Sequence, residues 1–338
     1  MPHQQKQEAE VISAVRILAK AINSGRDVTT GMSILIEATS QLSLTNLDFW
    51  ERLIRWELFR ELQSSRPSKW KFWSQPAPSS LPKWVDLCSK DGFKREKTLR
   101  TLSEAAPNAF FFALAVRRLN DWVIQVRDAA REALPIIAKA TNPETVVDVL
   151  CTIFPHWNSW GRMNNEEKQA LLEIISIESV GRSLKKRILS APSGPMTSIL
   201  SQAGRTEILD HSLEEIAREA IQPSVRAKSY RCLLEGKMTW VAGRKWEWIN
   251  KYYCKGHFKP ILCERDLLVT SPFLETLKSA ARDRSPIVRR VAGEQLIREL
   301  DKIGVDSLQL AQLLATDPSP SVAERGEFAV KKLKEPSL

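Results

Sequence analysis

Few residues in this 338-residue chain have the types and spacing that support metal binding. Cys254, His257 and Cys263 lie close together in the sequence, and Cys232 is the nearest further cysteine. A structural zinc site takes four such ligands, usually from two close-spaced pairs. Because the second pair is missing, we predict no metal and no other cofactor.

Motifs for nucleotide hydrolysis and acyl transfer are also missing. The sequence contains no phosphate-binding Gly-Lys-Ser/Thr loop, no dinucleotide fingerprint and no Gly-x-Ser-x-Gly elbow. The adjacent acids Glu166 and Glu167 diverge on a helix rather than facing one site. Glu235-Gly236-Lys237 matches half of a nuclease motif, but that motif needs a β-hairpin, and the sequence does not indicate one here. The balance favours a protein that is not an enzyme.

Positive charge is concentrated in two segments that are also rich in tryptophan. The whole chain has a net charge of +10. Residues 66–97 hold eight Lys or Arg and three acidic residues, and residues 237–259 hold six and one, so each segment carries +5. Six of the eleven tryptophans lie in these two segments. They are therefore the candidate binding regions.

Three interpretations of these segments stay open. Lysine and arginine neutralise phosphates, and exposed aromatic rings stack on unpaired bases, which indicates nucleic acid. Tryptophan, tyrosine and arginine also dominate protein interfaces. Alternatively, the rings anchor each segment to the fold. The candidate residues for binding nucleic acid or a partner are Lys69, Trp70, Lys71, Trp73, Arg244, Lys245, Trp246, Trp248, Lys251, Tyr252 and Lys255.

The elements that position these segments are helices. Apolar residues recur at three- and four-residue steps over 11–22, and further helices are expected over 32–42 and 47–62, within an N-terminal helical region spanning 1–63. Four prolines interrupt residues 64–97, which we interpret as a basic connection. Glycine is scarce and β-branched residues form no alternating runs, so we predict an all-α fold.

The same features bear on location. No apolar run approaches the roughly 20 residues that cross a membrane, and the N-terminus lacks the pattern of a signal peptide. The five cysteines are scattered, which is typical of reduced thiols. We therefore expect a cytoplasmic protein without a membrane partner. The sequence does not indicate the oligomeric state.

A short pattern recurs four times after residue 98. In each copy a valine is followed by a small residue four positions later and an aliphatic residue eight positions later, so the three share one helical face. An arginine follows the valine in three copies, and an Asp or a Ser-Pro or Asp-Pro turn precedes the helix, as expected of an N-terminal cap. The anchor valines are Val126, Val225, Val288 and Val322.

This pattern resembles HEAT repeats, whose second helix typically opens with Asp or Pro and carries a V-R-x-x-A core. The resemblance covers about residues 98–334, with a basic Trp-rich insertion at about 237–262. It implies an α-solenoid, in which helix pairs bury their apolar faces by stacking on their neighbours. We therefore expect a non-enzymatic scaffold that binds a protein partner, and also nucleic acid through its basic segments. A bacterial nucleic-acid-processing or defence complex is a setting that suits such a scaffold.

An enzymatic alternative comes from the same architecture. Asn120-Asp121-Trp122 and the helix start at 285–290 resemble parts of the HEAT-like alkylpurine DNA glycosylases. That resemblance implies Asp121 as the catalytic acid, with Trp122 and Arg289 near the DNA. The other aromatic positions of that family cannot be matched in this chain. The two hypotheses differ in whether Asp121 is needed for the release of modified bases.

Overall fold

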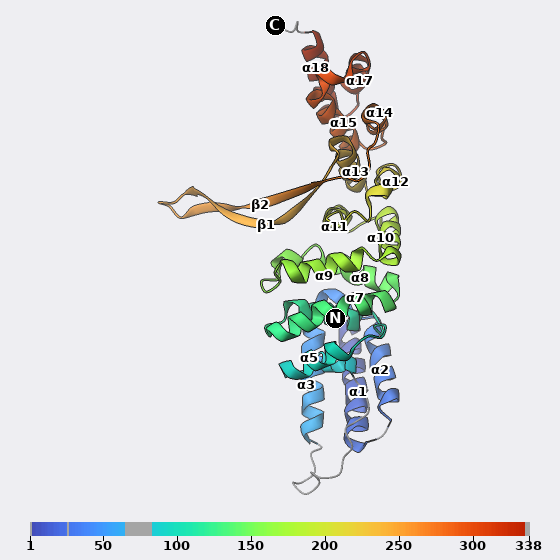
Figure 1. Ribbon diagram of the computed structural model, residues 1–338, viewed down its shortest axis with the longest axis vertical. Coiled ribbons are helices and arrows are strands. Elements are labelled where there is room, and N and C mark those ends of the chain that lie inside the picture. The colour runs from blue at the N-terminus through green and yellow to red at the C-terminus, as the bar shows by residue number, and fades with distance from the viewer. Residues whose placement is uncertain (1, 26, 65–82, 335–338) are drawn as a thin grey trace. The chain divides into compact units, whose positions relative to one another are not determined.

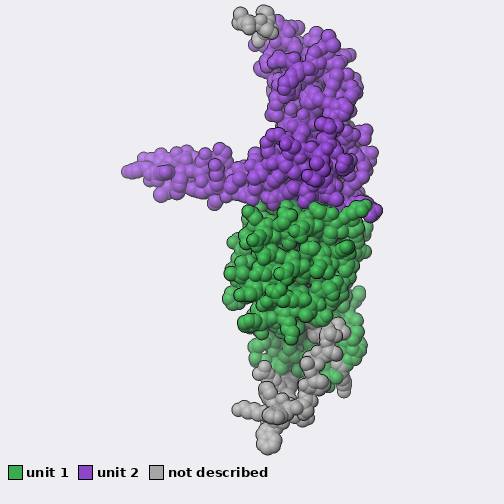
Figure 2. Space-filling view, in the orientation of Figure 1, with its two compact units in different colours: residues 1–180 green, residues 181–338 purple. Residues whose placement is uncertain are grey.

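The computed structural model describes residues 2–25, 27–64 and 83–334, and most of these lie in helices (Figure 1). The mostly helical class predicted from the sequence is confirmed. The chain forms two compact units, residues 1–180 and 181–338 (Figure 2). The boundary falls within helix α10 (Glu178–Ser190), and the three-part division expected from the sequence stays a prediction.

Helices are the only regular secondary structure among the described residues of unit 1. Helices α1, α2 and α3 pack together, α5 packs on α7, α7 packs on α9, and α6 packs on α8. The elements are α1 (Pro2–Ser24), α2 (Val28–Ser40), η1 (Leu44–Asn46), α3 (Leu47–Ser64), α4 (Lys83–Asp86), α5 (Gly92–Thr101), α6 (Ala109–Arg117), η2 (Arg118–Asn120), α7 (Ile124–Ala140), α8 (Pro143–Ile153), η3 (Trp157–Ser159) and α9 (Asn165–Ile175).

The three helices predicted near the N-terminus are present as α1, α2 and α3. Val11, Val15 and Leu18 of α1 are fully buried, as the periodicity predicted. Helix α1 ends beside Gly25, whose φ of +61° is a left-handed conformation that favours glycine.

The expected basic connection is helical in its described part. Residues 83–97 contain α4 and the first part of α5. The cause is local, because the Asp91 side chain accepts a hydrogen bond from the Phe93 amide and caps α5. The remaining candidate residues of this segment, Lys69, Trp70, Lys71 and Trp73, lie outside the described residues.

Unit 2 consists of helix pairs and one two-stranded sheet in its described residues. Helices α12 and α13, α14 and α15, and α17 and α18 pack as pairs, and α15 contacts both α13 and α18. After α10, the elements are α11 (Met196–Ala203), η4 (Asp210–Ser212), α12 (Leu213–Glu219), α13 (Pro223–Glu235), β1 (Lys237–Asn250), β2 (Lys255–Asp266), α14 (Phe273–Ala281), α15 (Pro286–Arg298), α16 (Leu300–Ile303), α17 (Asp306–Ala315) and α18 (Pro320–Lys334).

The four repeat copies fold alike. Helices α7, α13, α15 and α18 each begin two residues before their anchor valine, and all four valines are fully buried. The small residue in the middle has the expected effect in the last copy. A Cβ added to Gly326 would lie 2.1 Å from the backbone nitrogen of Ala315, so only glycine permits the approach of α17 to α18.

Residues 237–266, which include the predicted insertion, form an antiparallel β-hairpin, contrary to the expectation that no hairpin is present. Strands β1 and β2 pair from Lys237 opposite Asp266 to Asn250 opposite Lys255, with bulges after Val241 and Trp248. They extend as a narrow arm from the helices of unit 2 (Figures 1 and 2). The sequence did not indicate the hairpin because most of both faces is exposed, which removes the apolar–polar alternation of a half-buried strand.

None of the helices in the described ranges combines the length and apolar character that a membrane crossing requires.

Candidate functional site

The hairpin arm, defined as residues 237–266, is fixed to unit 2 at its base. Arg265 donates hydrogen bonds to both carboxylate oxygens of Asp210, at 2.8 and 2.7 Å, and to the carbonyl of Gly204 at 2.7 Å. Lys228 of α13 donates to the carbonyl of Thr239 at 2.7 Å. Because these donors and acceptors are largely buried, they hold the start of β1 and the end of β2 in place.

Apolar packing supports the same base. Met238 is fully buried, and its sulfur lies 3.6 Å from the sulfur of Cys232. Gly204 receives the Met238 side chain, since a Cβ at Gly204 would lie 2.6 Å from it. Arg205 lies over the ring of Trp240, 5.5 Å from its centroid. Trp240 thus anchors the arm to the helices of unit 2. Its role matches the third interpretation of the aromatic residues, in which the rings anchor a segment to the fold.

Beyond its base the arm has one aromatic face. Residues directly opposite one another in the register share a face, and so do alternate residues along a strand. Trp246 lies opposite Phe258, and Trp248 is two residues further along the same strand. The ring centroids of Trp246 lie 5.0 Å from Phe258 and 5.4 Å from Trp248, in edge-to-face geometry. All three side chains are exposed.

Gly256 permits this ring cluster to form. It lies opposite Trp248, and a Cβ there would come within 2.6 Å of the Trp246 ring and 2.7 Å of the Glu247 carbonyl oxygen. The ring of Trp246 therefore lies across the space that a larger residue at 256 would fill.

The other face of the arm is charged. Lys245 lies directly opposite Lys259, and Glu247 lies opposite His257. The Nζ atom of Lys259 is 3.3 Å from a carboxylate oxygen of Glu247. Lys245, beside this ion pair, contacts no carboxylate of the described residues.

The tip adds exposed rings and cations. Tyr252 and Tyr253 pack edge to face with centroids 4.9 Å apart, and Tyr252 is 87% exposed. Lys251 and Lys255 flank them in the sequence. Cys254 closes the turn with a φ of +49°, which is unusual for a residue other than glycine.

Most of the arm's cations have no acidic partner within the described part of the chain. Lys237 pairs with Glu264 at the base, and Lys259 pairs with Glu247. No carboxylate lies within ion-pair distance of the remaining four outside the base, and all four are exposed. They are Arg244, Lys245, Lys251 and Lys255.

The predicted candidates of this segment therefore lie on one arm, but its cysteines form no ligand set. Cys232 is buried beneath the base, whereas Cys254 is exposed at the tip. Among the residues that the structure describes, no group of three or more His, Cys, Asp or Glu is placed to hold a metal ion.

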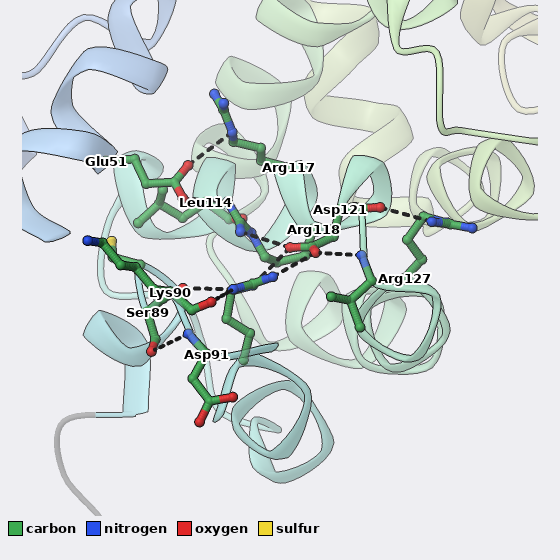
Figure 3. Close-up of polar contacts among 12 residues, drawn as sticks. Glu51, Ser89, Lys90, Asp91, Leu114, Arg117, Arg118, Asp121 and Arg127 are labelled. Carbon is green, nitrogen blue, oxygen red and sulfur yellow. Dashed lines mark hydrogen bonds and ion pairs between the residues drawn. The ribbon is translucent and has the colours of Figure 1, made fainter. Parts of the chain in front are cut away.

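Asp121, the candidate catalytic acid, lies in a buried ion cluster of unit 1 (Figure 3). Arg95 donates to both of its carboxylate oxygens, at 2.8 and 2.9 Å, and Arg118 donates at 3.0 Å. Arg118 also donates to Glu51 at 2.8 Å. The amide of Val123 donates to Asp121 at 3.0 Å.

This environment favours the carboxylate form of Asp121. Burial by itself would raise the pKa of Asp121, but the hydrogen bonds from Arg95 and Val123 and the charge of Arg118 hold that pKa below its ordinary value of 3.8. A general acid needs a raised pKa to keep its proton near neutral pH. The site therefore favours a structural role for Asp121.

The same contacts recur in unit 2. Arg226 donates to both carboxylate oxygens of Asp283 at 2.9 Å, and Arg289 donates to both of Asp317 at 2.5 and 2.9 Å. The amide two residues after each aspartate donates back to it, at 2.7 Å from Ser285 and 2.8 Å in the later copy. We call the pairs Arg95–Asp121, Arg226–Asp283 and Arg289–Asp317 the arginine–aspartate ladder.

The repeat arginines also share a backbone contact. Arg127, Arg226 and Arg289 each donate from Nη1 to the carbonyl six residues earlier, at 2.9, 2.8 and 2.9 Å. Each arginine thereby closes the turn before its own helix. Trp122 and Arg289, which the glycosylase resemblance placed near DNA, belong to these turns, and Arg289 is engaged with Asp317.

Arg95 marks a fifth copy that the sequence pattern did not include. Its Nη1 donates to the carbonyl of Ser89, six residues earlier, at 2.8 Å. Helix α5 begins three residues before Arg95, as α13 and α15 do before Arg226 and Arg289. Lys94 replaces the anchor valine, which hid the copy, although buried Thr98 and Leu102 occupy the small and aliphatic positions.

Glu235, from the half nuclease motif, is also engaged. It accepts hydrogen bonds from Gln295 at 2.7 Å and Arg298 at 2.9 Å, and Lys237 pairs with Glu264. The hairpin that the motif requires is present, but Glu235 lies at the end of α13 and joins that helix to α15.

Comparison with protein-family models finds no matching family, and comparison with curated protein sequences finds no significant match.

Proposed function

We propose that this chain is a non-enzymatic, HEAT-like α-solenoid scaffold that binds a protein partner, with the hairpin arm as a second contact surface. The arginine–aspartate ladder supports the repeat organisation, because one set of contacts joins successive helical copies in each unit. Such stacking buries apolar faces between repeats and leaves an extended surface for a partner.

Exposed apolar side chains at equivalent repeat positions carry the proposal. Trp122 and Ile221 each lie five residues before a repeat arginine, and Phe93 and Ile287 each lie two residues before one. Phe93 is 84% exposed and Trp122 is 70% exposed. Large apolar groups in water at recurring positions are typical of a protein-binding surface. We call Phe93 and Trp122 the apolar edge of unit 1, and Ile221 and Ile287 stand at the equivalent positions of unit 2.

The test compares two double variants. The edge variant carries Phe93→Ala and Trp122→Ala, and the control variant carries Ile17→Ala and Ile136→Ala, which are exposed apolar residues of the same unit outside the edge. The tagged chain is purified from its natural cells with nuclease treatment. A protein that co-purifies in stoichiometric amount is then produced separately, and calorimetry measures its affinity for each variant. We expect the edge variant to weaken partner binding by about 30-fold, because buried Trp anchors at interfaces contribute 2 kcal/mol or more.

The control variant should bind the partner like the unaltered chain. Equal binding by the edge variant, or the lack of any stoichiometric partner, would overturn the proposal. Base release from alkylated DNA that is lost in Asp121→Asn would favour the glycosylase instead.

A further inference from the structure

We propose that the hairpin arm binds single-stranded nucleic acid, with its cations on the phosphates and its rings stacked on unpaired bases. This inference rests on the proposed role of the arm as a contact surface, and it does not depend on the apolar edge. Three observations carry it: the unpaired cations, the exposed rings and the preference for lysine.

The arm's charge fits a polyanion. Between Arg244 and Lys259 there are five Lys or Arg and one acid, Glu247. Four of the five cations have no acidic partner within ion-pair distance in the described chain. Lys245 and Lys259, which lie opposite one another on the face away from the rings, add to the positive potential of the arm.

The rings fit unpaired bases. Trp246, Trp248 and Phe258 form one exposed face, and Tyr252 and Tyr253 continue the aromatic surface at the tip. Stacking on aromatic rings tolerates every base and is the usual contact to single strands. In a duplex the base faces are already stacked on one another, so these rings would have no equivalent partner.

The kind of cation favours nucleic acid over protein. Interfaces between proteins are enriched in arginine and depleted in lysine. On the arm, four of the five cations between 244 and 259 are lysines. The anchoring contacts of Arg265 and Lys228 lie at the base of the arm. Residues 244–259 are therefore left free for a ligand.

The outer part of β1 offers an extended contact to a single strand of nucleic acid. Residues 244–250 extend over roughly 20 Å, at about 3.3 Å per residue. This length places Arg244 at one end of the ring row and Lys251 and Lys255 at the tip. A single strand lying along the ring face would therefore meet cations at both ends of its contact.

The experiment measures the affinity of the full chain for fluorescent 15-nucleotide probes by anisotropy. The probes are oligodeoxythymidylate, oligouridylate and a duplex of oligodeoxythymidylate with oligodeoxyadenylate. We expect both single strands to bind at least 10-fold more tightly than the duplex. The two single-stranded probes distinguish DNA from RNA as the natural ligand.

The charge variant replaces the four unpaired cations of the arm by alanine. We expect an affinity loss of at least 30-fold, and a salt slope that is smaller by about 3, because each phosphate contact on a single strand contributes about 0.7. The matched control replaces four exposed cations outside the arm and should bind like the unaltered chain. The control positions are Lys20, Lys139, Arg282 and Lys302.

A ring variant keeps the inference testable if charge removal alters the fold. Trp248→Ala with Tyr252→Ala removes two exposed rings and leaves every cation in place. Each ring should contribute roughly 5- to 150-fold to affinity. The far-ultraviolet circular dichroism of each variant, which reports helix content, establishes that the helical part of the chain is folded.

Three results would overturn the inference: no binding of either single strand, unchanged binding by both the charge and ring variants, or tighter binding of the duplex. If the charge variant no longer binds the protein partner but still binds the nucleic-acid probes, the arm is a protein-binding surface instead. The edge variant should bind the probes like the unaltered chain. A failure of the scaffold proposal can therefore be distinguished from a failure of the nucleic-acid inference.

Discussion

The two basic segments carry the same net charge in the sequence but use it in different ways. In the described part of the first, Arg95 is 3% exposed and is bound to Asp121, and Lys94 lies 2.7 Å from Asp86. In the second, Arg244 and Lys245, like Lys251 and Lys255 at the tip, have no acidic partner among the residues that the structure describes. Arg95 and Lys94 of the first segment are thus paired with acids of the fold, whereas the exposed cations of the second segment are available to a ligand.

The aromatic residues differ in the same way. Trp84 of the first segment is buried and packs edge to face on Phe111, with centroids 6.3 Å apart. Trp246 and Trp248 of the arm are exposed and contact other arm rings. A basic aromatic composition therefore indicates binding only where the side chains lack partners inside the fold.

The largest expected effect comes from breaking the buried ion cluster. Asp121→Asn should lower the free energy of unfolding by about 3–5 kcal/mol, because Arg95 and Arg118 would then be buried charges without a full partner. Urea unfolding followed by circular dichroism measures this change. Glu37→Gln, at an exposed acid of the same unit, is the control and should change stability by less than about 0.5 kcal/mol. A native-like stability for Asp121→Asn would contradict the structural role assigned to the ladder.

The second effect is the response to acid. The pKa values of Asp121 and Asp317 lie below their ordinary value of 3.8, and for Asp317 the main cause is its hydrogen bond from Arg289. A carboxyl with a lowered folded pKa adds stability above pH 3.8, and this stability is lost as pH falls through the folded pKa.

Unfolding midpoints in urea between pH 6 and pH 2.5 test this dependence. We expect the unaltered chain to lose stability below about pH 4. Asp121→Asn, which has no ionisable group at position 121, should lose less over the same range. Parallel curves for the two proteins would show that Asp121 does not contribute.

The smallest expected effect is on the arm. Lys245→Ala removes one member of the opposed lysine pair and no contact to the body of unit 2. Its stability should therefore lie within about 0.5 kcal/mol of the unaltered chain. Thermal unfolding measures it, with Met238→Ala at the buried base as the contrasting variant. A large destabilisation by Lys245→Ala would mean that this charge is used internally, and the distinction between the two segments would fail.

The helices and repeat starts were predictable because their causes are local. Apolar spacing near 3.6 residues and proline or cap residues at helix starts act over a few positions, and α7, α13, α15 and α18 begin where the pattern places them. The copy at Arg95 was missed because a lysine stands at its valine position. The hairpin was missed because two largely exposed faces leave no alternating burial pattern.

The sequence by itself determined that the chain is mostly helical, that one helix start recurs, and that its surplus charge lies in two segments. Only the tertiary structure decided which charges are neutralised. Arg95 and Asp121 are 26 residues apart, and Arg226 and Asp283 are 57 apart. Charge interaction depends on distance in space and on burial, and neither can be read from the position of a residue along the chain.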